Sequence, residues 1–434
     1  MVPAPPNSKR PLPPHDEQTV SGPPPGQIRN DSSLPISPLK PMPQALGRDG
    51  GGGGSQDSSS DDSDDSGPRR KPPPGPFRRL HDKEEVTKRR EKALVKLQDY
   101  FAQDSSHFKF IGIVGQGLTN IACKVKLRNR WFNPYPSEYF ILKRAVRANQ
   151  ENSLRRERRN LRRLRGALHV VQAYSPRIRI DVPDVILMEN LENGSLWEFM
   201  ERRRFRLFGE LPNRLLYRLF MCLVRFGIAM AYPPNGPRDA ELRREEIPRR
   251  KADRDNKSQL VHGDMHANNV LFGRLTANDW EHELTPILKL IDLERMGYAQ
   301  HDTIKDPGVH LNVIAIGKLM FSLITGWGVK DNETFMDRAV VDGNWVDVET
   351  VALFPRGMNP HLDPELKSIV VRCLSTYDRL RPTLEELERV MSQGIKSKQS
   401  DYYAKYPLAN LETDANIKLA VRSLIFDAPI NPPP

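Results

Sequence analysis

Two apolar patterns alternate along the chain from about residue 83 onward. Apolar side chains three or four positions apart indicate a helix with one buried face, whereas short apolar runs bounded by glycine or polar residues indicate strands. The helical spacing predicts helices over residues 83–102, 151–165, 211–231, 311–325, 366–374, 384–391 and 411–426. The apolar runs predict strands from residue 108 onward, over 121–127, over 139–143, from 169 onward and over 185–191. Strands precede most of the helices, an order that predicts an α+β fold.

Residues 1 to about 80 show neither pattern. Many of the chain's 38 prolines and 28 glycines lie here, with a glycine run over 50–54 and an acidic Ser/Asp stretch over 55–66. Such a segment buries too little apolar surface to offset the entropy lost on ordering, so we expect a disordered tail. Four serines beside aspartates are either phosphate acceptors for an acidophilic kinase or simply solvated: Ser58, Ser59, Ser60 and Ser63.

The net charge of +11 over 434 residues is clustered. Basic side chains gather in bands near residues 69–92, 155–165 and 243–254. Such bands are typical of nuclear address signals and of surfaces that bind nucleic acid or acidic partners. Because neither interleaved aromatic residues nor zinc-ligand spacing accompanies them, nucleic-acid recognition is not favoured, and solvated helix faces are the simpler interpretation.

The cysteines and the apolar runs indicate a cellular compartment. Cys123, Cys222 and Cys373 are far apart in apolar contexts, which predicts buried free thiols in a reducing environment. Met1 is followed by Pro-rich polar sequence, so we expect no signal peptide. We also expect no membrane span, because no apolar run reaches the ~18 residues that one needs. These features predict an intracellular protein of the cytoplasm, the nucleus or both.

The polar residues with the clearest chemistry interrupt an apolar run over 260–272. The interruption holds Asp264 and, five positions on, Asn269, and a second apolar run over 287–291 leads into Asp292. Phosphoryl transfer requires a carboxylate that faces the attacking hydroxyl and oxygen ligands for a magnesium ion on the nucleotide. Ordinary surface turns are also rich in Asp and Asn, but two such loops in this order favour the catalytic interpretation.

Upstream segments offer groups that suit a bound nucleotide. The segment from Phe110 forms a glycine-rich turn, in which glycines let the backbone close over phosphates; these glycines are Gly112, Gly115 and Gly117. Lys143 ends a short apolar strand, and Glu157 lies one turn before Leu161 on the helix over 151–165. A lysine at the end of a strand is ordinarily a solvated edge residue. A phosphate-binding role for Lys143 is therefore favoured only if Glu157 lies close enough to pair with it.

The loop His262-x-Asp264-x-x-x-x-Asn269, followed by Ile291-Asp292, resembles the catalytic and metal-binding loops of the protein-kinase-like superfamily over roughly residues 105–395. The resemblance implies a bilobal protein-kinase-like fold with a small β-rich N-lobe and a larger helical C-lobe. The implied division is a tail over 1–80, a flanking helix over 83–104, an N-lobe over 105–192, a C-lobe over 193–395 with a mobile basic insertion at about 233–257, and an extension over 396–434.

The resemblance also implies ATP and Mg²⁺ as cofactors and a role for each candidate residue. Gly112, Gly115 and Gly117 would cover the phosphates, and backbone groups near Glu189 and Leu191 would bind adenine. Lys143 would bind the α- and β-phosphates and pair with Glu157. Glu151 competes for this pairing, but Arg155 occupies the position one turn later, where an apolar residue is expected. Asp264 would act as the base, and Asn269 and Asp292 would hold the metal.

The chain departs from the protein-kinase pattern at several positions. Asp292-Leu-Glu replaces Asp-Phe-Gly, Gly263 replaces an arginine, and His266 replaces a lysine. The segment after Asp292 is short and lacks Ala-Pro-Glu, and Asn312 stands for the aspartate of the following helix. These loops are also similar to those of aminoglycoside and choline phosphotransferases, whereas the helices around Arg381 favour protein kinases.

Three functions therefore remain. The first is a serine/threonine protein kinase whose basic insertion over 238–257 favours acidic protein substrates. The second is a kinase of small hydroxyl metabolites. The third is a non-catalytic nucleotide-binding module, which the retained carboxylates disfavour because buried carboxylates are costly to keep ionised without a metal. The sequence leaves the oligomeric state open.

Overall fold

The computed structural model describes residues 76–103, 108–116, 120–128, 137–145, 151–174, 185–205, 209–237, 240–301, 303–355, 357 and 359–428. The predictions for the acidic stretch and its serines and for Gly117 lie outside these residues, as does the expected tail up to residue 75. Residues 76–80, expected to be disordered, instead belong to the first helix, which begins seven residues before the predicted start at residue 83. The helices are α1 Pro76–Gln103, α2 Glu151–Arg163, α3 Leu196–Phe205, α4 Asn213–Ala231, α5 Lys251–Asp255, α6 Pro307–Thr325, α7 Pro364–Cys373, α8 Leu384–Ser397 and α9 Asp414–Val421. The strands are β1 Phe108–Gln116, β2 Asn120–Leu127, β3 Tyr139–Ala145, β4 Ala173–Tyr174, β5 Val185–Glu189, β6 Leu260–Val261, β7 Val270–Phe272, β8 Leu288–Leu290, β9 Gly297–Tyr298, β10 Phe335–Val341 and β11 Asn344–Thr350.

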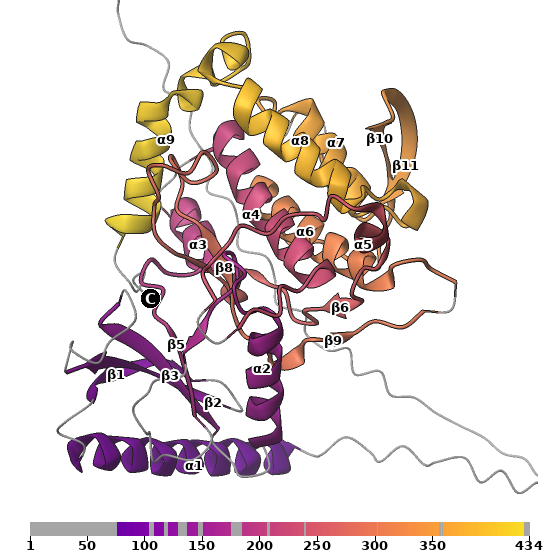
Figure 1. Cartoon of the computed structure of the whole chain (residues 1–434). Helices are drawn as coiled ribbons and strands as arrows, with labels where there is room; N and C mark the ends of the chain where they lie inside the picture. Colours follow the sequence, from indigo (N-terminus) through magenta and orange to yellow (C-terminus); the bar gives the residue numbers. More distant parts are fainter. Residues whose placement is uncertain are drawn as a thin grey trace, which may run out of the picture. The chain divides into compact units, whose positions relative to one another are not determined.

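The described chain is a mixed α+β fold, as predicted, with a five-stranded antiparallel sheet in the order β1-β2-β3-β5-β4 (Figure 1). Alternate residues of β2 and β3 are buried, among them Val125 and Leu142. They form one core with Leu97 and Phe101 of α1. Because successive strand residues point to opposite faces, the other face of β3 carries Lys143 between Ile141 and Ala145, which pack against the larger hydrophobic core.

The glycine-rich segment differs from the prediction of a turn. Gly112 and Gly115 lie inside β1, where they pair with Lys124 and Ala122 of β2. The pairing register shifts twice along β1, between Phe110 and Gly112 and again between Ile113 and Gly115. Glycine permits such bulges at little steric cost, so the pattern that suggested a turn marks an irregular strand instead.

The helical part is built around α4, in which every residue is buried. This helix packs against α6 and α8. Gly394 of α8 allows the close approach, since a Cβ there would lie 2.3 Å from the ring of Tyr217. The expected helices over 211–231, 366–374 and 384–391 are thus present, each slightly shifted or extended at its ends.

Helix α6, alone among the described residues, is long and apolar enough to cross a membrane by length and composition, although no apolar run of that length was expected. Its side chains Val313, Ile316 and Met320 are fully buried in the helical core, beside α4 and α7. A buried core helix has the same composition as a membrane span, so this position accounts for the apolar sequence.

Two elements differ from the patterns read in the sequence. The hairpin of β10 and β11 was not predicted; it turns at Asp342 and Gly343, both with positive φ. The single helix expected over 411–426 is instead α9 followed by a π-helical turn over Arg422–Phe426.

The segment over 233–257 is more firmly held than the predicted mobile insertion. The backbone of Arg243 bonds to Gly166 and Leu168, at 2.9 and 3.0 Å. The side chain of Glu245 is buried. The described part of this segment is therefore anchored to the chain that follows α2.

Candidate active site

The ammonium group of Lys143 joins residues far apart in the sequence. Its Nζ lies 2.9 and 2.8 Å from the two carboxylate oxygens of Glu157 and 2.7 Å from Oδ1 of Asp292. Lys143 lies near the end of β3, Glu157 faces it from α2, and Asp292 follows β8. These three predicted residues are thus brought together, and the lysine that would ordinarily be a solvated edge residue is only 9% exposed.

Burial and charge act in opposite directions in this cluster. Burial by itself would lower the pKa of Lys143, but Glu157 and Asp292 outweigh it and raise that pKa. Burial raises the pKa of Glu157 to about 7, although Lys143 opposes the change. The two carboxylates therefore hold the lysine charged, and Glu157 depends on the lysine to stay ionised, because an isolated carboxylate at this depth would take up a proton.

The choice between Glu157 and Glu151 follows from this geometry. Glu157 is fully buried and contacts Lys143 directly. Asn160, one turn further along α2, donates to the carbonyl oxygens of Leu293 and Met296 at 2.8 and 3.2 Å. Helix α2 is therefore held at once to β3 and to the segment after Asp292. Asn160 was not singled out in the sequence, since one buried asparagine in an arginine-rich helix gives no pattern.

A further carboxylate stands beside Asp292. Oxygen atoms of Glu157, Asp292 and Glu294 lie within 4.8 Å of one another, and the amide of Asn120 in β2 donates to Glu294 at 2.9 Å. Asp292 itself adopts a left-handed backbone conformation with φ 60°. In the sequence, Glu294 stood out only because it replaces the glycine of Asp-Phe-Gly. Its position beside Asp292 indicates that it adds negative charge to the Lys143 cluster.

His262 connects the two loops that carry Asp264 and Asp292. Its Nε2–H donates to the carbonyl of Ile291 at 3.0 Å, and its Nδ1 accepts the backbone N–H of Asp264 at 3.2 Å. Burial lowers the pKa of His262, which keeps the imidazole neutral for this pair of bonds. Asn312 of α6 adds a third support, because its amide donates to the carbonyl of Leu260 and its oxygen accepts the N–H of His262.

Asp264 and Asn269 lie on one short loop. The amide nitrogen of Asn269 donates to the backbone carbonyl of Asp264 at 2.9 Å and closes the loop. The Asp264 carboxylate is partly exposed and lies 3.8 Å from both His266 and Arg295. Neither contact is a hydrogen bond at that separation, so the carboxylate remains accessible to the hydroxyl group of an acceptor.

Gly263 is required by the backbone rather than by charge. Its φ is 75°, and a Cβ at this position would lie 2.7 Å from the carbonyl oxygen of Arg295. The close approach brings the Asp264 loop against the segment after Asp292. A side chain of any kind, including the arginine that the protein-kinase pattern would place here, conflicts with this packing.

Of the residues predicted to bind the nucleotide, Gly115 lies near Lys143 in the sheet, and Glu189 and Leu191 lie at and just after the end of β5. Gly115 pairs with Ala122, which in turn pairs with Lys143, so this glycine lies in the same row across the sheet as the lysine. The carboxylate of Glu189 is engaged by Lys289 at 2.7 and 2.9 Å. Leu191 follows β5 and is half-buried.

Arg381 donates to the carbonyl oxygens of Ser375 and Thr376 at 3.0 and 3.3 Å. These bonds hold the chain between α7 and α8. Comparison of the sequence with protein-family models and with curated proteins finds no match.

Proposed function

We propose that this protein is a magnesium-dependent ATP phosphotransferase with a bilobal protein-kinase-like arrangement, and that it phosphorylates serine or threonine hydroxyls of proteins. The observation that carries the proposal is the contact of Lys143 with both Glu157 and Asp292. If Lys143 served only to stabilise the fold, one carboxylate would be enough to pair with it. A lysine held between two carboxylates, one of them partly exposed, leaves a cationic group positioned for a polyphosphate beside an acid that can take a metal.

The donor set suits a magnesium ion. Asp292 offers a carboxylate that is about one third exposed, and Glu294 adds another nearby. Because Asn269 uses its amide nitrogen on Asp264, its amide oxygen remains as a neutral donor. Oxygen ligands of this kind are those that Mg²⁺ prefers, and the bound ion would neutralise charge on the phosphates. Asp292 and Asn269 would hold it.

We assign to Asp264 the role of acting on the acceptor. In the proposed reaction the hydroxyl oxygen of the acceptor forms a bond to the γ-phosphorus while the bond to the β–γ bridging oxygen breaks, and ADP leaves. The proton of the hydroxyl passes to the Asp264 carboxylate. The backbone of Asp264 is fixed by His262 and Asn269, so the carboxylate is positioned before the acceptor arrives.

An exposed basic surface supports a protein acceptor. Arg243 and Arg250 have side chains 83% and 84% exposed, and Lys251 is 80% exposed, each within 4.0 Å of an exposed acid of the same segment: Glu241, Asp253 and Asp255. Arg244, by contrast, is bound to Asp279 at 2.5 Å and has a structural position. Exposed cations of this kind attract acidic partners over long range.

Small hydroxyl compounds are the second candidate acceptors, and one observation favours them. The chain between Asp292 and α6 runs only from Leu293 to Asp306, and β9 within it pairs with β6. Such a short, paired segment offers little extended backbone for a peptide to lie against. The choice of acceptor therefore needs a direct comparison of the two substrate classes.

Nucleotide binding provides the first test. Mg-ATP should raise the melting temperature, since a hundredfold excess over the dissociation constant stabilises the folded state by about 2.7 kcal/mol. Asp292→Asn should weaken this stabilisation, whereas Asp264→Asn should leave it nearly intact. No shift at millimolar Mg-ATP, with a known kinase responding in parallel, would refute the proposal.

A further inference from the structure

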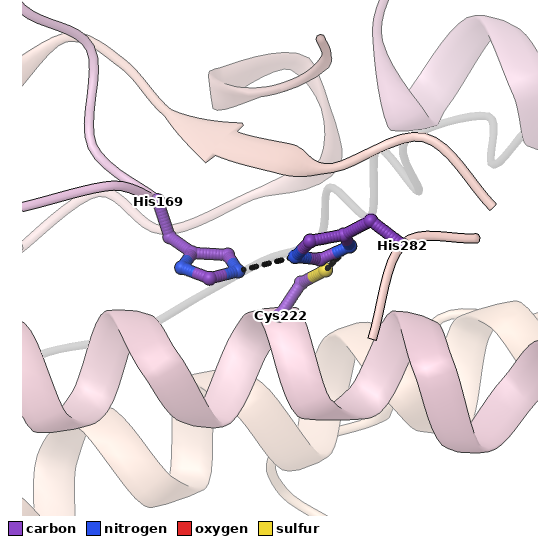
Figure 2. Close-up of side chains that lie close together, drawn as sticks. All are labelled: His169, Cys222 and His282. Atoms are coloured by element: carbon purple, nitrogen blue, oxygen red, sulfur yellow. Dashed lines mark hydrogen bonds between the residues drawn. The ribbon is translucent and has the colours of Figure 1, made fainter. Parts of the chain in front are cut away.

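Away from the Lys143 cluster, three buried side chains of metal-binding type meet in the helical core. His169 follows α2, Cys222 lies in α4, and His282 lies in the turns between β7 and β8. None is more than 1% exposed. Figure 2 shows the two imidazole rings facing each other with the thiol beside them, and one ligand atom from each residue lies within 4.8 Å of the others.

The two histidine nitrogens have a spacing close to that of a tetrahedral metal site. Nε2 of His169 lies 3.1 Å from Nε2 of His282. Sγ of Cys222 lies 3.9 Å from Nδ1, the other ring nitrogen of His282. Two nitrogens bound to zinc at ~2.05 Å are separated by about 3.3 Å at the tetrahedral angle. The distance between the two histidine nitrogens therefore suits a shared ion, and the Cys222 thiol would have to move toward the Nε2 side of His282 to complete the set.

Glu245 fixes the orientation of His169. Its Oε2 lies 2.6 Å from Nδ1 of the ring, and its Oε1 accepts the backbone N–H of the same residue at 2.7 Å. A carboxylate at Nδ1 holds the ring proton there, which leaves the lone pair of Nε2 directed at His282. Histidines that bind metals commonly have such a carboxylate behind them.

The same side chains also allow an arrangement without a metal. Without an ion, the four residues would instead form a hydrogen-bonded relay from Glu245 through both histidines to the thiol, with a long final step of 3.9 Å.

We propose that His169, Cys222 and His282 bind a structural Zn²⁺ ion, with a water molecule as the fourth ligand. Two nitrogens and one sulfur are donors that Zn²⁺ accepts readily. On binding, the Cys222 S–H bond breaks, the sulfur bonds to zinc and the proton passes to solvent. The ion joins α4 to the chain after α2 and to the turns between β7 and β8, three segments distant in the sequence.

Metal analysis tests the proposal on the full-length chain, purified without a histidine tag and dialysed after incubation with zinc. Wild-type protein should retain about one zinc ion per chain, and Cys222→Ser should lose most of it. Two controls should retain zinc: Cys373→Ser, a fully buried thiol elsewhere in the core, and Asp292→Asn, which alters the proposed nucleotide site. Loss of zinc in Asp292→Asn but not in Cys222→Ser would overturn the assignment.

A second measurement remains decisive if Cys222→Ser fails to fold. Cobalt added to the metal-free wild-type chain should give the near-ultraviolet absorption of a cobalt–thiolate bond and the visible bands of a tetrahedral ion. Removal of zinc by a chelator should lower the melting temperature, and zinc should restore it. Substoichiometric zinc after reconstitution, with no cobalt–thiolate absorption and no effect of chelation, would show that the cluster is a hydrogen-bonded relay without an ion.

Discussion

Replacing Lys143 with methionine tests the ion cluster on which the proposed function depends. The change keeps an unbranched side chain of similar length and removes only the charge. It leaves Glu157, whose side chain is 1% exposed, without its cation. The carboxylate of Asp292 also loses a partner, but at 36% side-chain exposure water replaces much of that interaction.

The expected cost comes almost wholly from Glu157. Removal of one partner from a buried ion pair typically costs about 3–5 kcal/mol, because the remaining carboxylate must either stay charged in the core or take up a proton. The exposed part of the cluster adds at most about 1 kcal/mol. Replacing Glu157 with methionine as well should recover much of the loss, since the buried charge is then absent. The interaction energy of the two changes should reach about 1–3 kcal/mol.

Urea denaturation of the four proteins at pH 7.5 measures these differences through the transition midpoint at constant m-value. A matched control is Lys124→Met on the neighbouring strand, where Lys124 pairs with Glu192 at 3.0 Å but both side chains are more exposed. Its cost should stay below about 1 kcal/mol. If Lys143→Met were no more destabilising than this control, or if the two changes were additive, the buried cluster would not exist as described.

Two further predictions concern Glu157 and the Asp264 loop, and a third concerns the basic segment over 243–250. Because the pKa of Glu157 is raised from 4.5 to about 7, the folded protein retains a proton that the unfolded chain releases. The stability of wild type relative to Glu157→Gln should therefore fall as the pH rises through this window, as denaturation at several pH values can measure; a flat difference would contradict the buried acid. Gly263→Ala should destabilise by about 1–3 kcal/mol, because φ is 75° and the Cβ meets a carbonyl oxygen, whereas an unchanged melting temperature would argue against this packing. Changing Arg243, Arg249 and Arg250 to serine should lower phosphorylation of acidic proteins and weaken the dependence of this activity on salt. If the activity did not change, small hydroxyl compounds would be favoured as the acceptors.

The sequence predicted local elements better than the contacts between them. The helices α4, α6, α7 and α8 follow from apolar residues at helical spacing, and β2, β3 and β5 from apolar runs between polar ones. The hairpin of β10 and β11 had a usable signal, because Asp342-Gly343 stands between alternating apolar and polar residues. The glycines of β1 misled for a physical reason, since glycine suits bulges as well as turns.

The cluster of His169, Cys222 and His282 could not be predicted in the same way. Each residue stands alone in its segment, and no short spacing connects them. Only the packing of α4 against the chain on either side of it brings them together. The position of Glu245 was obscured for a related reason: it lies in a charged segment that composition alone assigns to a mobile surface.

Transfer of a labelled γ-phosphate tests the central claim most directly. The full-length chain would be incubated with Mg-ATP and, separately, with acidic proteins and with small hydroxyl metabolites, beside an Asp264→Asn variant shown by thermal shift to bind Mg-ATP. The account predicts label on serine or threonine of a protein, reduced at least ~100-fold in the variant because the base is lost. Absence of transfer to either class of acceptor, or equal transfer by the variant, would contradict the assignment of Asp264 and the proposed function.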